Sequence, residues 1–113
     1  MNNPEEAIKS YKKAIELKPG NFDAFFNLGV VYYNLGVKQV DVANLVPSNQ
    51  PEKYETEKGK ADLEFKKALP YLEKAYELKA EDKSLLDALK NVYYRLLMLD
   101  KYEAMLESLK RIN

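Results

Sequence analysis

The chain contains a partial copy of itself, and this internal repetition constrains the fold more than any other feature of the sequence. When the chain is shifted by 61 residues, Lys13–Lys18 falls on Lys74–Lys79, with only the third residue changed. The same shift pairs further residues: Ala7 with Ala68, Leu28 with Leu89, and Tyr32–Tyr33 with Tyr93–Tyr94. Self-similarity at one fixed spacing is typical of repeat proteins, in which similar units stack side by side.

The stretch Phe22–Gly36 indicates what kind of unit is repeated. Its residues Phe25, Leu28 and Tyr32 recur at helical spacing and form one apolar stripe. Gly29 lies inside this stripe, where a glycine costs about 1 kcal/mol of helix propensity relative to alanine. A glycine at such a position needs a packing reason, and we expect a neighbouring helix to approach its backbone closely.

This pattern resembles the first helix of a tetratricopeptide repeat. The residues that carry the resemblance are the ring of Phe25, the pair Leu28–Gly29, the ring of Tyr32 and the small residue Gly36. The resemblance covers residues 4–36 and 65–112. The family's period is about 34 residues, so the observed spacing is about 27 residues too long. We therefore expect an insertion at about residues 37–64.

The resemblance and the helix signals together predict an all-α fold, an α-solenoid of antiparallel helix pairs. Asn3–Pro4, Asn21 and Asp82 are suited to helix starts, and Pro19–Gly20 ends the first helix. The expected helices span residues 4–18, 22–45, 51–79, 83–98 and 101–112. In the fourth helix, the residues expected to face inward are Leu85, Leu86, Leu89, Tyr93, Leu96 and Leu97.

The repeat pattern divides a single domain of residues 1–113 into three parts. Residues 4–19 resemble the second helix of a repeat whose first helix is absent. Residues 22–80 form a repeat with the insertion, and residues 83–112 form the last repeat. Because the pattern begins in mid-repeat, we expect the chain to be a fragment of a longer protein. Any targeting segment would then lie upstream, and the sequence indicates no localisation.

The insertion is expected to lengthen two helices into a projecting antiparallel hairpin. Apolar residues continue at helical spacing beyond Gly36, and no turn cluster occurs before residues 46–51. On the returning helix, a coiled-coil seam is formed by Tyr54, Ala61, Phe65, Ala68, Leu72 and Ala75. Pro70 is expected to kink this helix near residues 65–67. The polar composition of residues 55–60 is also compatible with a disordered loop.

Composition argues against several functional classes. Lys and Arg together number 18, as do Asp and Glu, so the chain lacks the basic excess of a nucleic-acid-binding or membrane-surface protein. No apolar run approaches the roughly 18 residues of a membrane span. The chain has no histidine and no cysteine, which removes the commonest general base and the usual zinc ligands. Its glycines are isolated, so no phosphate-binding loop is present. We expect no catalytic residues, no metal site and no cofactor.

The resemblance also implies a binding surface, because the first helices of tetratricopeptide repeats line a concave groove. The residues placed there are Phe26, Asn27, Val30, Tyr33 and Asn34 from one helix and Asp87, Asn91, Tyr94 and Arg95 from the next. Asparagine amides can hydrogen-bond an extended backbone, and tyrosines offer apolar area with a polar tip. The alternative is that these residues serve only as amphipathic surface and inter-helix packing.

Some members of the family bind peptide C-termini through a clamp of lysines and asparagines. Here the candidate lysine positions hold Phe26 and Asp87. Asn27 and Asn91 alone do not form a cationic clamp. We predict that this chain does not capture C-terminal carboxylates.

These observations favour a non-catalytic protein–protein interaction module that binds a peptide or protein segment in the concave groove. A structural role is the alternative, in which the long hairpin or the uncapped ends drive self-association into a homo-oligomer. Apolar pairs at the ends, such as Tyr11 with Ile15 or Leu106 with Leu109, would then be covered by another copy. An enzyme would require a convergent polar pocket, which the sequence does not show.

Overall fold

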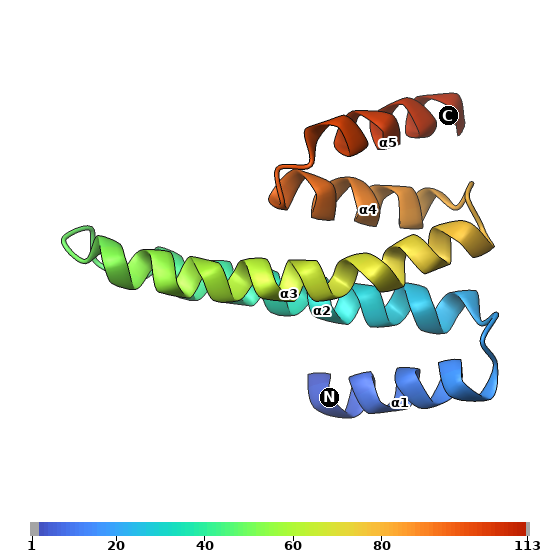
Figure 1. The fold of residues 1–113 in the computed structure, drawn as a ribbon, viewed down its shortest axis with the longest axis horizontal. Coiled ribbons are helices and arrows are strands. Elements are labelled where there is room, and N and C mark those ends of the chain that lie inside the picture. Colours follow the sequence, from blue (N-terminus) through green and yellow to red (C-terminus); the bar gives the residue numbers. More distant parts are fainter. Residues whose placement is uncertain (1–2, 113) are drawn as a thin grey trace.

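The computed structural model describes residues 3–112, which form five α-helices packed in series (Figure 1). The helices are α1 (Pro4–Leu17), α2 (Phe22–Asn44), α3 (Pro51–Leu78), α4 (Lys83–Arg95) and α5 (Leu99–Ile112). Each helix packs against the next one in the chain. The long hairpin of α2 and α3 lies in the middle, with α1 on one side and α4 and α5 on the other. The all-α prediction is confirmed.

Local sequence signals explain where the helices begin. Three helices start at a residue whose side chain accepts hydrogen bonds from backbone N–H groups of the first turn: Asn3 for α1, Asn21 for α2 and Asp82 for α4. Pro4 and Pro51 stand in the first turns of α1 and α3, where the missing N–H has no helical partner to lose. The bounds of the first three helices agree with the predicted ones to within one residue.

The seam of the α2–α3 hairpin holds most of the buried side chains of these two helices. From α3 the fully buried residues are Ala61, Phe65, Ala68, Leu72 and Ala75, all of which belong to the predicted seam. The seam continues into the projecting part of the hairpin, where Ala43 of α2 is also buried. The extension is therefore an ordered helical hairpin, and the alternative of a disordered loop between residues 37 and 64 is wrong.

Two glycines let α3 approach the backbone of α2. A Cβ atom built on Gly29 would lie 2.5 Å from Cγ of Leu72, and one built on Gly36 would lie 2.5 Å from Cε1 of Phe65. Real Cβ atoms do not come this close to other carbon atoms. The predicted reason for Gly29 is confirmed, and Gly36 serves the same purpose two turns further along α2.

Pro70 lies inside α3, as expected from the extension of that helix upstream. Proline removes one backbone donor and crowds the preceding turn, which bends a helix. Figure 1 shows the axis of α3 changing direction in its C-terminal half. The bend turns this half of α3 along the shorter α4.

The predicted boundary between the last two helices is wrong. Helix α4 ends at Arg95 instead of residue 98, and α5 begins at Leu99 instead of residue 101. The N–H of Met98 donates to the carbonyl of Tyr93, and the N–H of Leu97 donates to the carbonyl of Tyr94. This is the Schellman arrangement of a helix end. It places Leu97 in the left-handed region at φ 59°, and its side chain is 76% exposed rather than inward.

The outer helices are less well covered than the hairpin. Among the described residues, α1 packs against α2 and against no other helix, and none of its side chains is fully buried. Tyr11 and Ile15, one of the apolar pairs considered for self-association, are half-buried. In α5 only Met105 is fully buried within the described range.

Over residues 3–112, none of the helices is both long enough and apolar enough to cross a membrane.

Substitution of Gly36 by alanine is expected to destabilise the protein by about 1–3 kcal/mol, since the added methyl group would overpack the Phe65 ring. This cost outweighs the roughly 1 kcal/mol that alanine gains in helix propensity. Gly59 is the matched control, because it lies in α3 and a Cβ atom added there would meet no neighbouring side chain or helix within 4 Å. Gly59→Ala should stabilise the protein. Urea unfolding of both variants checks this, and equal shifts in the same direction would contradict it.

Substitution of Leu97 by glycine is expected to stabilise the protein by roughly 0.5–1 kcal/mol. Glycine adopts a positive φ without the steric cost that Leu97 carries, and the exposed leucine side chain loses little packing. Leu97→Ala is the control, because it removes the side chain but keeps the Cβ atom. Thermal unfolding should show a gain for glycine only. A loss of stability in Leu97→Gly would show that the leucine side chain stabilises the turn.

Candidate functional site

The predicted groove residues come from α2 and α4, which contact each other directly in addition to their contacts with α3. The two helices lie on neighbouring sides of α3, so that residues on their facing surfaces can contribute to one binding surface. Asn27, Val30 and Tyr33 of α2 are half-buried, as is Asn91 of α4. Arg95 at the end of α4 is exposed.

Tyr33 and Arg95 meet at a shared aromatic ring. The ring of Tyr33 is tilted against that of Phe65, with 5.4 Å between the two centroids. The guanidinium group of Arg95 lies 5.5 Å from the centroid of the same Phe65 ring. Phe65 itself is almost completely buried, and one edge of its ring lies against the backbone of Gly36. Two of the predicted groove residues, one from each helix, thus pack against the same side chain of α3.

Other predicted groove residues have partners elsewhere. Tyr94 packs against Tyr102 of α5, with ring centroids 5.3 Å apart. Asp87 forms an ion pair of 2.9 Å with Lys90 on its own helix. Phe26 stacks on Phe22, one turn earlier in α2, with 5.9 Å between the centroids.

Asn34 borders a different surface, a notch between α1 and α2. This cavity of about 660 Å³ is lined by residues of the first half of α1 and by Val31, Asn34, Leu35, Val37 and Lys38 of α2. Tyr11 is the aromatic residue on the α1 wall. Asn34 and Tyr33 are adjacent in sequence, but their side chains leave the helix about 100° apart. The structure therefore does not bring these two residues to one place.

A second cavity lies on the projecting part of the hairpin, and sequence reasoning missed it. This hairpin groove, of about 380 Å³, is lined by Leu35, Lys38, Gln39 and Val42 of α2 and by Lys60, Leu63, Glu64 and Lys67 of α3. The spacing of Leu35, Lys38, Gln39 and Val42 is that of one helix face. Leu35 and Val42 belong to an apolar row that the sequence reveals, but the row alone did not show that it stays uncovered.

A polar contact joins the two helices inside the hairpin extension. The side-chain amide of Gln39 donates to the carboxylate of Glu57 at 2.8 Å and to the Glu57 backbone carbonyl at 3.2 Å. Lys60 donates to the other carboxylate oxygen of Glu57 at 3.1 Å. The hydrogen bonds from Lys60 and then from Gln39 lower the pKa of Glu57 below its ordinary value. Gln39 thereby fixes the register of α2 against α3 in the part of the hairpin that projects past the N-terminal end of α1.

A second polar contact joins α3 to α4. The hydroxyl of Tyr93 donates to the carboxylate of Glu73 at 2.7 Å, and Lys101 of α5 lies 3.9 Å from the same carboxylate. Burial, followed by the hydrogen bond to Glu73, raises the pKa of Tyr93 well above its usual range. A neutral Tyr93 at physiological pH is a hydrogen-bond donor that stabilises the fold.

Throughout the part of the chain that the structure describes, no group of three or more Asp or Glu residues is arranged to hold a metal ion. The carboxylates with described partners mostly pair with lysines on the same helix, at exposed or half-exposed positions.

Removal of the Tyr93 hydroxyl in Tyr93→Phe is expected to lower the free energy of unfolding by about 1–2 kcal/mol at pH 7, because a hydrogen bond to a charged acceptor is lost. The raised pKa means that this contribution is present below the ordinary tyrosine pKa of about 10 and is lost as the pH rises through the folded value. The difference in free energy of unfolding between the wild type and Tyr93→Phe should therefore become smaller at alkaline pH. Urea unfolding at several pH values measures this difference, with Tyr54→Phe as the control. A difference that does not change with pH would contradict a stabilising hydrogen bond from Tyr93 to Glu73.

Comparison with known families agrees with the helical arrangement. Residues 1–36 match the family model described as a TPR repeat. This match spans α1 and the first part of α2, including the stretch with Gly29 and Gly36. A comparison with curated proteins finds no match to the chain. TPR repeats generally mediate protein–protein interactions and are typically non-catalytic. The matched segment and the five-helix architecture together support identification of the chain as similar to tetratricopeptide repeat proteins.

Proposed function

We propose that this chain binds an extended segment of a partner protein along the surface shared by α2 and α4. The observation that carries the proposal is the meeting of Tyr33 and Arg95 on the ring of Phe65. Groups from two different helices are held there at fixed positions, and a rigid site loses little conformational entropy when a ligand binds. The match of residues 1–36 to a repeat that generally binds proteins or peptides supports the same role.

The residues on this surface suit a polypeptide ligand. Asn27 and Asn91 each carry an amide that can donate to a backbone carbonyl and accept from a backbone N–H. Arg95 adds an exposed cation, which can pair with an acidic side chain or bond a carbonyl. Tyr33 provides a half-buried ring with a polar tip. Without lysines at positions 26 and 87, the surface favours internal segments over free C-terminal carboxylates.

The proposal is tested by affinity capture on the immobilised intact chain, with the recovered proteins quantified by mass spectrometry. The groove variant combines Asn27→Ala, Asn91→Ala and Arg95→Ala, which remove polar groups without opening the buried core. Each lost hydrogen bond is worth about 0.5–1.5 kcal/mol, so specific partners should be recovered at least about tenfold less well.

The matched control changes the same residue types outside the groove: Asn44→Ala, Asn49→Ala and Arg111→Ala, all at exposed positions. It should recover partners as the wild type does. Equal recovery by the groove variant and the wild type would overturn the groove proposal.

Self-association is a second candidate, and the exposure of the end helices favours it. Helix α1 has one neighbouring helix among the described residues, and Leu17 at its end is 74% exposed. Leu99 and Ile112 of α5 are also exposed. A second copy that packed against either end would bury this apolar surface. Light scattering over a wide range of concentration decides the matter, since a monomer at all concentrations would exclude this role.

A further inference from the structure

The projecting half of the hairpin carries a face that α1 would cover if α1 were longer. Figure 1 shows α2 and α3 continuing well past the N-terminal end of α1. Helix α1 begins at that point, because its N-cap residue Asn3 has extended backbone angles. The Asn3 side chain accepts hydrogen bonds from the backbone N–H groups of Glu5 and Glu6. Leu35 and Lys38 border both the notch beside α1 and the hairpin groove, so the two cavities are neighbours along α2.

The hairpin groove includes apolar side chains that the seam of the hairpin leaves exposed. Val42 is 46% exposed and Leu63 is 58% exposed, whereas their neighbours in the seam, Ala43 and Ala61, are buried. Exposed apolar side chains that are rimmed by polar ones mark interaction surfaces more often than scattered single ones do. Val42 and Leu63 share their cavity with Leu35, which makes them a patch rather than isolated residues.

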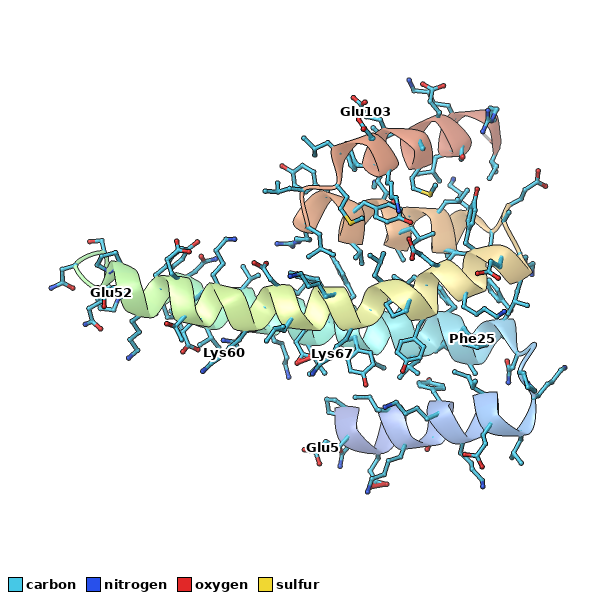
Figure 2. All side chains as sticks on the ribbon, in the orientation of Figure 1. Glu5, Phe25, Glu52, Lys60, Lys67 and Glu103 are labelled. Atoms are coloured by element: carbon cyan, nitrogen blue, oxygen red, sulfur yellow. The ribbon has the colours of Figure 1, made fainter. Side chains whose placement is uncertain are left out.

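The rim of the groove is predominantly basic. Lys38, Lys60 and Lys67 line it, against one carboxylate, that of Glu64. Figure 2 labels Lys60 and Lys67 along the lower edge of the hairpin, on the side where α1 lies. Lys60 and Lys67 form ion pairs with carboxylates three residues away on α3, but both side chains remain more than half exposed, and such surface pairs are weak. Lys38 has no ion pair within residues 3–112 and is exposed.

From this geometry we propose that the hairpin groove binds an acidic amphipathic helix of a partner protein. A helix is the fitting shape because the groove continues the α2 face on which α1, itself an amphipathic helix, already lies. The distance from Leu35 to Val42 is about 10 Å along the axis of α2, which matches roughly two turns of a bound helix. Leucine-like side chains would meet Val42 and Leu63, and carboxylates would pair with Lys38 and Lys60.

This inference is independent of the surface between α2 and α4. The hairpin groove is lined by residues of α2 and α3 only, and none of the proposed α4 groove residues borders it. The proposal therefore describes a second docking surface and a different kind of ligand, a folded helix instead of an extended segment.

The test uses fluorescence anisotropy with two synthetic peptides of about 14 residues, or four helical turns. The first peptide has one leucine face flanked by glutamates, and the second has lysine at each glutamate position. The intact wild-type chain should bind the acidic peptide at least about tenfold more tightly than the basic one, and its affinity should fall as salt is added. Equal binding of the two peptides, or binding of neither, would overturn the proposal.

The variant Lys38→Glu/Leu63→Ser then locates the site. Both residues are exposed, so the fold should be retained, and binding of the acidic peptide should weaken by about tenfold or more. Lys12→Glu/Leu45→Ser is the matched control, because it makes the same changes at exposed positions outside the groove and should bind as the wild type does. An unchanged affinity in Lys38→Glu/Leu63→Ser would overturn the assignment.

A second copy of the chain is the competing occupant. Light scattering on the wild type would then show a molecular mass that rises with protein concentration. The mass would fall to the monomer value in Lys38→Glu/Leu63→Ser, and this result would overturn a partner helix in favour of self-association.

The triple variant of Asn27, Asn91 and Arg95 should bind the acidic peptide normally. Loss of partner capture in that variant, with normal peptide binding, separates the two surfaces.

Discussion

The close approach of α2 and α3 is the contact on which the rest of the structure depends. Gly29 and Gly36 leave room for Leu72 and Phe65, so that two large side chains pack directly on the α2 backbone. On α3, the small residues Ala61, Ala68 and Ala75 alternate with these large side chains along the seam. Because this seam runs past the ends of the neighbouring helices, it can support a projecting hairpin without help from α1 or α4. The remaining helices are placed by the faces that this hairpin presents to them.

Phe65 connects the seam to the candidate groove. Its ring lies against Gly36 of α2 and also packs against Tyr33 and Arg95. A shift of the ring toward α2 would meet the backbone at Gly36, so this contact supports the two groove residues from below. Binding residues supported in this way keep their geometry before a ligand arrives, which lowers the entropic cost of binding. The same side chain thus contributes both to stability and to the proposed recognition.

Much of the fold was predictable from the sequence, because its signals are local. The caps at Asn3, Asn21 and Asp82 and the seam of small and large residues act within a few turns of helix. The turn after α4 could not be predicted in the same way. It depends on Leu97 in a left-handed conformation, where glycine is expected, so the apolar run 96–97 was interpreted as helix.

The candidate site was less predictable than the fold, because side-chain direction depends on tertiary packing. Resemblance to a repeat family indicated a common surface for Tyr33, Asn34 and Tyr94, but each of these residues has different neighbours in the structure. Arg95 reaches Phe65 only because α4 ends beside the middle of α3. The hairpin groove stays uncovered because the N-terminal end of α1 lies short of it. The spacing of residues within one helix cannot predict where a neighbouring helix begins.

Packing in series has a consequence for how the molecule loses structure. A helix that touches one neighbour can detach at the cost of one interface, whereas α2 and α3 must break several at once. Amide hydrogens in α1 and α5 should therefore exchange with solvent through partial opening, well before the central hairpin unfolds. Each detachment transiently exposes the apolar face of the adjacent helix. Chaperones, proteases or another chain would therefore bind first at α1 or α5.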